Sequence, residues 1–366
     1  MTRGNSTRET NSKVVHQAML RRLPRRNTAS GRIELVAAPS LLDHYQAMLL
    51  RIFASLGRAF NEQEAAHLRD VLESCLKKGW EASPGSYLVV QYETDEPPKT
   101  SLSYDITIDV YTLEDTYQRW TKTRTPPLFG ALPDAKVMHL ALQQGNPKDQ
   151  PVLDIGAGSG RNTLPIARFG FPTDAVELAP ALASMLRDEV EKARLPVRVF
   201  EGDATDASLG LPKDYYQLVI MAEVIASHCR SAAHLRQLLA TSAEVLRPGG
   251  LLLFSGFLTL DGYRPDAVAR ELGEVFWCPM FTLADFLAAA AGLGLELIEN
   301  ESVMLYEHAN LPAGAWPPTG WFEDWVSGGD LFDLPFGRAP IEMRWMTWRR
   351  NGDDASNQRD VAKADE

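Results

Sequence analysis

The apolar residues between positions 40 and 78 recur every three or four residues. Leu49 and Phe53 follow this spacing, which places them on one face of an amphipathic helix. The segment FNEQEAAHLRDVLESCLKKGW predicts a second helix, which Asn61 caps and Gly79 ends. The pattern therefore predicts two neighbouring helices early in the chain.

Two segments after these helices alternate between apolar and polar residues. SYLVVQYET and YDITIDVYT predict two strands, and the turn-forming DEPPKTSL separates them. Together with the helices they predict a small α+β module over residues 36–111. His44 and His67 lie on the predicted helices without a partner at the spacing of metal ligands, so we expect no metal site there.

Residues 151–257 alternate between strand-like and helix-like segments. PVLDIG, TDAVEL, VRVFEGD, YQLVIMAE and GLLLFSGF are the predicted strands, and helical segments lie between most of them. This order predicts an α/β fold with a Rossmann-like, doubly wound and mostly parallel sheet, in a domain over residues 112–350. The segment PIEMRWMTWRR predicts a last strand, which this fold class pairs antiparallel.

The two ends of the chain differ in composition from the rest. The first 35 residues carry eight Lys and Arg against two Glu, and no apolar stretch of a secretory signal follows. Residues 1–35 are therefore predicted to form a basic disordered tail. An organelle-targeting segment or a tether to an acidic partner is the alternative. Residues 351–366 are predicted to form a second disordered tail.

The loop after the first strand of the predicted sheet, GAGSGRN, holds three glycines within five residues. Glycines allow a positive φ angle and a close approach of the backbone to a ligand. The dinucleotide fingerprint G-x-G-x-x-G requires a third glycine where Arg161 stands, so the loop departs from that pattern after Gly156 and Gly158. A GxG pair alone leaves the ligand open.

Acidic residues at the ends of successive strands suit S-adenosylmethionine (AdoMet). Asp154 is placed to hold the methionine ammonium, and Glu177 to accept hydrogen bonds from both ribose hydroxyls. Because an acidic residue also binds the ribose of NAD, Asp203 does more to separate the two ligands: it is placed to accept the adenine amine. The helix that begins near Arg161 points N–H groups toward the methionine carboxylate. The predicted AdoMet-binding residues are Asp154, Gly156, Gly158, Gly160, Arg161, Asn162, Glu177, Asp203 and Ala204.

The set VLDIGAGSG, AVEL, EGDA and VLRPGGLLLF resembles the class I AdoMet-dependent methyltransferases over roughly residues 113–350. The Gly-Arg-Asn that ends the glycine loop, and YQRWTKTRTPPL upstream, resemble the tellurite-resistance methyltransferase family. That resemblance implies that Tyr117, Trp120 and Arg124 form a lid over the methyl donor. A linker is the alternative, because two consecutive prolines forbid a continuing helix.

The sequence offers few groups for the methyl acceptor. Glu223 and His228 follow the fourth strand, with no Asn/Asp-Pro-Pro-Tyr/Phe segment and no Pro-Cys, which disfavours nucleic-acid methylation. Methyl transfer needs alignment more than a strong base, so His228 is either a general base or a helix-end residue.

The resemblance also implies acceptor-side residues near the end of the domain. The tellurite-resistance family has a His-Arg pair after its penultimate strand and a further Arg before the last one. His308 matches the histidine, but Ala309 stands in place of the arginine, and Arg338 or Arg344 supplies the later one. This departure disfavours an oxyanion substrate, for which a guanidinium is the natural partner. The predicted catalytic residues are Glu223, His228, His308 and Arg338.

An aromatic segment, AWPPTGWFEDWVSGGDLFDLPFGRAP, precedes the last strand. It is either a packed surface loop or a cover over an apolar or soft acceptor. We therefore expect a small-molecule substrate: a thiol, a selenium or tellurium species, or a larger organic compound.

Composition limits the partners. The formal net charge of −11 disfavours nucleic acid and anionic membranes, and no apolar run is long enough to span a bilayer. Cys75, Cys229 and Cys278 form no CxxC pair, which suits a reducing, cytoplasmic location. The sequence predicts an AdoMet-dependent methyltransferase without a metal, and its N-terminal module is available to a protein partner. The alternatives are an NAD(P)-dependent oxidoreductase and a non-catalytic AdoMet-binding interaction protein.

Overall fold

The computed structural model describes residues 8–352, which divide into two compact units. The N-terminal unit runs to Leu113 and the C-terminal unit begins at Glu114, so the division lies two residues beyond the predicted one. Of the predicted tail over 351–366, residues 353–366 lie outside the described residues. Between residues 8 and 352, no helix combines the length and apolarity needed to cross a membrane.

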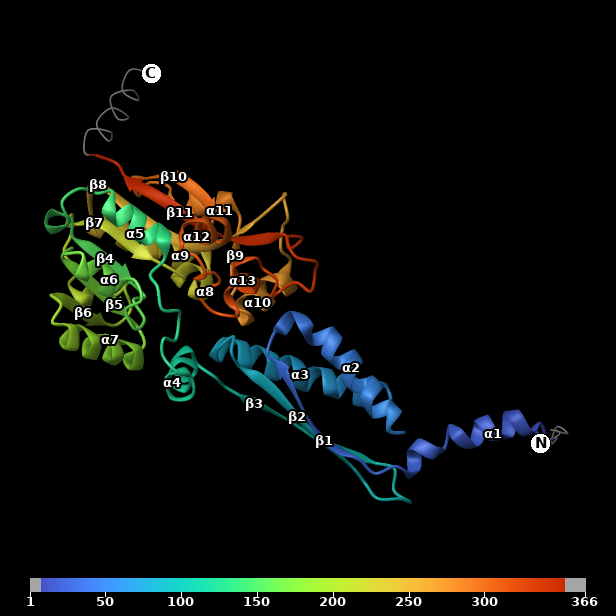
Figure 1. Ribbon diagram of the computed structural model, residues 1–366. Helices are drawn as coiled ribbons and strands as arrows, with labels where there is room; N and C mark the ends of the chain where they lie inside the picture. Colours follow the sequence, from blue (N-terminus) through green and yellow to red (C-terminus); the bar gives the residue numbers. More distant parts are fainter. Residues whose placement is uncertain (1–7, 353–366) are drawn as a thin grey trace. The chain divides into compact units, whose positions relative to one another are not determined.

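The N-terminal unit packs two helices against a three-stranded antiparallel sheet (Figure 1). Its helices are α2 (Leu42–Ser55) and α3 (Glu62–Ala82), and the strand order is β1 (Ser30–Val36), β2 (Tyr87–Thr94), β3 (Leu102–Asp109). Leu49, Phe53, Leu72 and Leu88 are fully buried at its centre. The predicted helix faces and both predicted strands are confirmed.

Asn61 caps α3 as predicted, but Gly79 does not end the helix. The Asn61 side chain accepts from the Glu64 backbone N–H, and the Glu64 carboxylate accepts from the Asn61 N–H in return. Gly79 is buried within α3, where a Cβ would lie 2.7 Å from the Cβ of Ala37. The glycine therefore serves the close packing of α3, which continues to Ala82.

The predicted disordered tail over 1–35 needs a correction. Residues 30–36 form β1, which pairs with β2 along its whole length, because Ile33 and Leu35 alternate with polar neighbours. Upstream lie a helix, α1 (Ser12–Leu20), and a short 3₁₀ turn, η1 (Leu23–Arg26). The prediction of a disordered tail relied on the basic composition of residues 1–35 and did not take the alternation in residues 30–36 into account. Residues 1–7 lie outside the described part of the chain.

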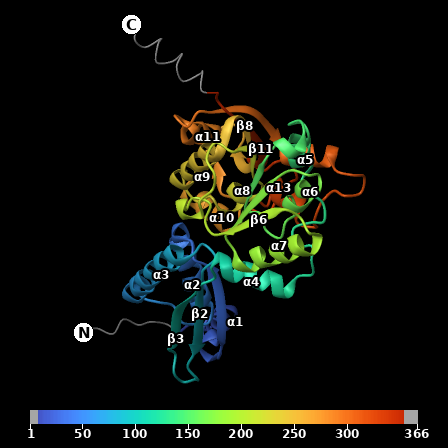
Figure 2. The same cartoon turned by 90° about the vertical axis from the view of Figure 1, so that its left-hand side faces the viewer.

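The C-terminal unit is built on an eight-stranded sheet, which confirms the doubly wound α/β fold (Figures 1 and 2). The order is β10-β11-β8-β7-β4-β5-β6, and a short β9 pairs with β8. Only β11 runs antiparallel to its neighbours, as predicted for the last strand. The strands are β4 (Val152–Ile155), β5 (Thr173–Glu177), β6 (Val197–Glu201), β7 (Tyr216–Met221), β8 (Leu246–Thr259), β9 (Met280–Phe281), β10 (Leu295–Ser302) and β11 (Ile341–Arg350).

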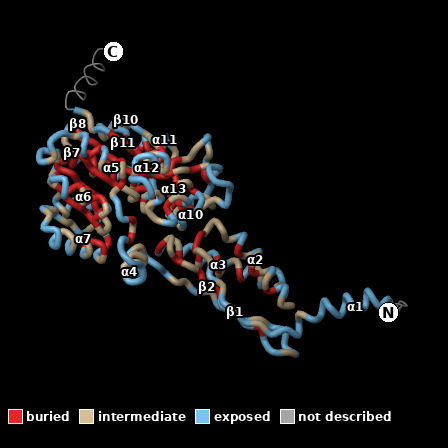
Figure 3. The backbone as a smooth tube through the Cα atoms, in the orientation of Figure 1, coloured by how far each residue is buried: buried red, intermediate tan, exposed pale blue. Residues whose placement is uncertain are grey.

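The pleat of the strands sends alternate residues into two cores, one on each face of the sheet. Leu153 and Ile155 belong to the core beneath α9 and α11, and Val152 belongs to the core beneath α5 and α6. Figure 3 shows the buried strands between the more exposed helices. The helices of this unit are α4 (Leu113–Thr123), α5 (Ala135–Leu142), α6 (Thr163–Arg168), α7 (Pro180–Ala193), α8 (Val224–His228), α9 (Ala232–Val245), α10 (Ala267–Val275), α11 (Leu283–Ala290), α12 (Val303–Asn310) and α13 (Phe322–Val326).

Two segments differ from the form that the sequence pattern predicts, which is a loop after the penultimate strand and a Pro-Gly-Gly turn before the strand GLLLFSGF. The stretch after β10 is helix α12 rather than loop, because the Ser302 side chain caps it by accepting from the Leu305 N–H. The Pro-Gly-Gly stretch lies within β8, where the register against β7 shifts. The aromatic segment before the last strand contains α13, and its Phe322 and Trp325 are buried against the sheet core.

Candidate functional site

The glycine loop connects β4 to α6 at the carboxyl edge of the parallel strands, where ligands of such sheets bind. Gly156, Gly158 and Gly160 all have a positive φ angle. A Cβ on Gly156 would lie 2.2 Å from the Val224 side chain, so no larger residue fits there. The loop therefore passes tightly under the turn that follows β7.

Asp154 and Glu177 flank this loop as predicted. Asp154 is buried at the end of β4 and accepts a hydrogen bond from the Thr163 hydroxyl at 2.6 Å. Burial raises its pKa to about 7, against the opposing effects of Thr163 and Arg161. A buried carboxylate with a raised pKa is stabilised by a cationic ligand group, which fits the predicted contact with an ammonium.

Glu177 ends β5 with both carboxylate oxygens held by backbone groups. Oε2 accepts from the Gly158 N–H at 2.7 Å, and Oε1 accepts from the Ala179 N–H at 2.8 Å. Burial raises its pKa, while these N–H donors oppose the change. Glu177 therefore fixes the glycine loop from the end of β5.

Asp203 and Ala204 follow β6 at the same edge of the sheet. The Asp203 carboxylate is exposed and accepts from the backbone N–H and the hydroxyl of Thr205, both at 2.8 Å. Ala204 is buried. The structure thus keeps the predicted order of acidic residues after three successive strands.

The side chains of Arg161 and Asn162 both bind other parts of the protein. The Arg161 side chain is buried and forms ion pairs with Asp134 and, at 2.6 Å, with Glu223. The Asn162 amide bonds to Asp134, donating to its carboxylate and accepting from its backbone N–H. α6 itself begins at Thr163. Both side chains are therefore engaged within the protein, while the contact of the backbone N–H groups at the start of α6 with a ligand carboxylate stays a prediction.

Asp134 is a site residue that the sequence analysis missed. As the residue before α5 it has the position of a helix cap, yet its side chain makes no cap bond. Glu307 of α12 caps α5 instead, by accepting from the N–H groups of Ala135 and Lys136. Such a long-range cap leaves the Asp134 carboxylate free to pair with Arg161, and no local sequence signal reveals it.

Glu223 and His228 lie in the turn and helix after β7, as predicted. Glu223 has a φ of 64°, an uncommon left-handed conformation, and its N–H donates to the Ser255 hydroxyl. Burial raises its pKa to about 7, although Arg161 opposes the change. His228 Nε2 lies 2.8 Å from the Tyr117 hydroxyl, and burial lowers its pKa to about 4. His228 is therefore a neutral imidazole at pH 7.

An aromatic cluster gathers around His228 and supports the lid interpretation of α4. Its rings contact one another at centroid distances between 5.1 and 6.3 Å. Phe129 also faces the glycine loop, since a Cβ on Gly158 would lie 3.5 Å from its ring. Arg124 stacks over the outer Trp120 ring at 3.9 Å. We call this set the lid cluster: Tyr117, Trp120, Phe129, His228 and Trp277.

Trp277 holds its place in the lid cluster with a strained backbone. Its φ is 59°, and its carbonyl accepts from the indole N–H of Trp325 at 2.9 Å. Trp325 belongs to the aromatic segment before the last strand. That segment therefore packs against the core and supports the cluster, and a cover over an acceptor stays a prediction.

His308 and Arg338 do not join this site. His308 is exposed near the end of α12 with its ring against Trp316, and Arg338 is exposed on the loop before β11. Within residues 8–352 neither has a hydrogen bond, ion pair or ring contact with the glycine loop, Asp154 or Glu177. Arg344 binds Asn300 and Glu342 within the sheet. The prediction of His308 and Arg338 as catalytic residues is not supported.

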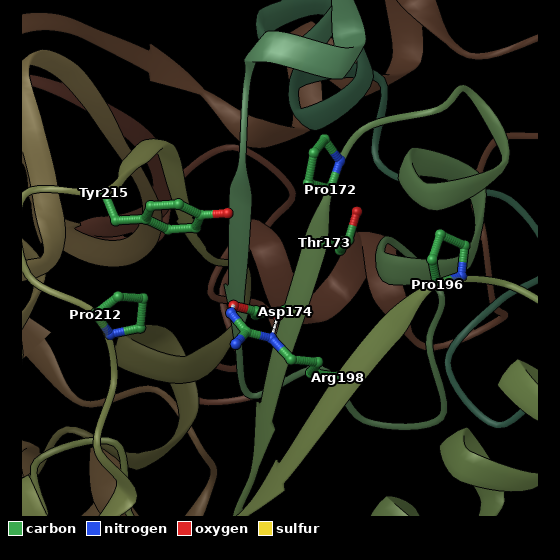
Figure 4. A pocket seen from close by; sticks show the side chains of 7 residues that line it. All are labelled: Pro172, Thr173, Asp174, Pro196, Arg198, Pro212 and Tyr215. Atoms are coloured by element: carbon green, nitrogen blue, oxygen red, sulfur yellow. Dashed lines mark hydrogen bonds and ion pairs between the residues drawn. The ribbon is translucent and has the colours of Figure 1, made fainter.

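A hollow of about 350 Å³ lies at the opposite edge of the sheet, before β5, β6 and β7 (Figure 4). Its Asp174 is buried and bound by the Arg198 guanidinium and the Tyr216 hydroxyl. These partners satisfy the Asp174 carboxylate, and the hollow lies away from the glycine loop. We therefore do not assign the hollow to the candidate site. No group of three or more metal-ligating side chains was found among the described residues.

The comparisons with known proteins agree with this geometry. Residues 152–250, from β4 into β8, match the family model described as a methyltransferase domain. With the strand order and the glycine loop, this match defines the region as a class I AdoMet-dependent methyltransferase domain. The match therefore favours the methyltransferase over the alternative of an NAD(P)-dependent oxidoreductase.

Individual relatives share only part of their length with this chain. The demethylmenaquinone methyltransferase of Tropheryma whipplei (strain Twist) is 26% identical over 136 residues, which is 37% of this chain and 53% of the relative. The ubiquinone/menaquinone biosynthesis C-methyltransferase UbiE of Stutzerimonas stutzeri is 35% identical over 111 residues, 29% of this chain and 41% of the relative. The chain thus spans about half the length of the curated relatives it matches.

Among solved structures, a putative sarcosine dimethylglycine methyltransferase from Galdieria sulphuraria aligns with a TM-score of 0.45 at 17% identity. The alignment covers 58% of this chain and 83% of that one.

Proposed function

We propose that this protein transfers the methyl group of AdoMet to an apolar, ring-bearing small molecule. The observation that carries the proposal is one edge of the sheet, where two buried carboxylates flank a glycine loop and an aromatic cluster covers it. AdoMet supplies the electrophilic methyl group of a sulfonium. The chain supplies binding, alignment and an environment without water.

The residues present fit AdoMet. Asp154 would bind the ammonium, Glu177 the ribose hydroxyls, and Asp203 with the Ala204 backbone the adenine. Val224 packs against the glycine loop at Gly156. Because a Cβ there would collide with Val224, only glycine allows the loop to take this position. These roles come from the position of each residue after its strand.

The lid cluster favours an apolar acceptor. Its members are aromatic, its histidine is neutral at pH 7, and the Tyr117 hydroxyl stays protonated because burial raises its pKa. A ring-bearing acceptor would stack on such side chains. The names of the two quinone-related relatives agree with this acceptor class.

The resemblance to the tellurite-resistance family gives only weak support to an oxyanion acceptor. In the Gly-Arg-Asn stretch, the Arg161 side chain binds Asp134 and Glu223, and the Asn162 side chain binds Asp134. Ala309 replaces the arginine that would bind an oxyanion, and Arg338 is exposed away from the site. We therefore propose the organic acceptor over selenite or tellurite.

An acceptor screen with the full chain tests the proposal. S-adenosylhomocysteine release is expected to be at least about tenfold faster with naphthol and quinol acceptors than with small thiols, selenite or tellurite. Trp277→Ala is expected to lower kcat/KM for the ring-bearing acceptor about tenfold, through lost stacking. Phe336→Ala, at an exposed aromatic residue outside the cluster, is the control.

Two results would contradict this function. Faster turnover with an oxyanion would overturn the acceptor class. Absence of turnover across the screen, with intact S-adenosylhomocysteine binding, would favour the non-catalytic interaction protein.

Binding of S-adenosylhomocysteine is expected to release about half a proton at pH 7. The reason is that Asp154 has a pKa of about 7 in the free protein, and an ammonium beside it lowers that pKa. The release is measured by titration calorimetry in buffers of different ionisation enthalpy. In the Asp154→Asn variant this release disappears, whereas an unchanged release would show that Asp154 does not face the ligand.

A further inference from the structure

α1 stands out because all of its residues are exposed, as the colour of the tube in Figure 3 shows. Large apolar residues normally avoid such exposure when they are clustered. Met19 is 67% exposed and Leu23, in the following turn, 57%. Val14, Val15 and Leu20 are also among the exposed large apolar residues. Five such residues therefore lie within ten positions of one another.

Four of the five apolar residues of α1 gather on one face, and Leu20 lies outside it. At 3.6 residues per turn, Val14, Val15, Ala18 and Met19 fall within an arc of about 140°. Lys13, His16 and Gln17 occupy the other side. The helix is therefore amphipathic, yet it packs its apolar face against nothing that buries it.

The turn after α1 is anchored, which separates this helix from a freely fraying end. Gly57, at the end of α2, meets the backbone of Pro24 and Arg25 so closely that a Cβ would lie 2.8 Å away. Gly57 has a φ of 78°, which glycine adopts without strain. The chain is thus attached at η1, while α1 before it remains exposed.

The charge of this segment is opposite to that of the whole chain. No acidic residue occurs between Glu9 and Glu34, while the chain as a whole has a net charge of −11. All basic side chains next to the apolar face are exposed: Lys13, Arg21, Arg22, Arg25 and Arg26. The expectation of no membrane partner came from the net charge, which averages over this local reversal.

We propose that residues 12–26 bind the surface of a membrane that contains anionic lipids. Apolar side chains on one face of a helix enter the boundary of the acyl chains, and flanking Lys and Arg bind the headgroup phosphates. The charge complementarity selects anionic lipid, and the exposed apolar face selects a lipid surface over an acidic protein or a nucleic acid. This inference is independent of the methyl-transfer function.

Co-sedimentation of the full chain with extruded vesicles tests the proposal. The protein is expected to bind vesicles of phosphatidylcholine with about 30% phosphatidylserine at least tenfold more tightly than phosphatidylcholine alone. Binding should weaken as salt rises, because salt screens the headgroup contacts. The variants Met19→Ser and Arg25→Gln/Arg26→Gln should each lower it severalfold. Leu305→Ser is the control, since Leu305 is also 67% exposed but lies in α12.

Each other outcome overturns the proposal. Equal binding to both vesicles, or no binding, would exclude an anionic lipid surface as the partner. Binding that the α1 variants leave unchanged would place the lipid contact elsewhere. Binding that depends on Arg25 and Arg26 but not on Met19 would indicate a purely electrostatic site, as for an acidic macromolecule.

Discussion

Glu177→Gln is expected to weaken S-adenosylhomocysteine binding about 100-fold, equivalent to about 3 kcal/mol. The Glu177 carboxylate holds the N–H groups of Gly158 and Ala179, one on each oxygen. An amide has a single acceptor oxygen, so its NH₂ group would face one of these N–H donors. The substitution thus loosens the glycine loop and removes the acceptor of the ribose hydroxyls together. Titration calorimetry measures the affinity.

Glu201→Gln is the matched control for this prediction. Glu201 pairs with Glu177 in register on the neighbouring strand β6, but it is exposed and bound to Arg187. Its loss should leave the affinity within about twofold, as for an exposed ion pair. If Glu177→Gln kept the fold and the wild-type affinity, Glu177 would not belong to the site.

The sequence predicted the sheet and the order of the acidic residues at the ends of its strands, because both depend on local patterns. Alternation of strand and helix sets the strand order, and the carboxyl ends of parallel strands meet at one edge. Asp154, Glu177 and Asp203 therefore came together from their positions at the ends of β4, β5 and β6. Each is determined by a residue pattern within a few positions of itself.

The remaining side of the site depends on contacts between distant segments. Arg161 looked like a ligand-binding residue because it stands in the glycine loop, but its partner Asp134 lies 27 positions away and Glu223 lies 62 away. Trp277 depends on the indole of Trp325, 48 positions further on. No periodicity encodes such pairs, since each requires the folded sheet to bring two loops together.

The family resemblance misled where it was carried over by position alone. His308 matched a histidine of the related family, but the neighbouring Glu307 points inward and caps α5, which leaves His308 exposed. On a helix, adjacent residues point in directions about 100° apart, so a match off by one position changes sides. Because a loop and not the helix α12 was predicted here, the opposite directions of Glu307 and His308 were not expected.

Arg161→Met is expected to lower the free energy of unfolding by about 3–5 kcal/mol at about pH 8. Arg161 is buried between the carboxylates of Asp134 and Glu223, and Met has a similar length but cannot donate a hydrogen bond. Its removal leaves two buried carboxylates uncompensated. Urea denaturation measures the change.

Arg187→Met is the matched control, because Arg187 pairs with Glu201 in an exposed position. There the cost should stay below about 1 kcal/mol. Adding Glu223→Gln to Arg161→Met should recover part of the lost stability, since one of the uncompensated carboxylates is then neutral. Equal losses in Arg161→Met and Arg187→Met would contradict a buried charge network.

The loss in Arg161→Met is also expected to shrink as the pH falls from about 8 to about 5.5. Burial raises the pKa of Glu223 in the folded protein to about 7, and Arg161 holds it lower than burial alone would. Without Arg161 that pKa rises further above the unfolded value. The folded state then binds more protons than the unfolded state, so stability decreases as pH rises through this range. A pH-independent loss would show that packing, not charge, is what Arg161 contributes.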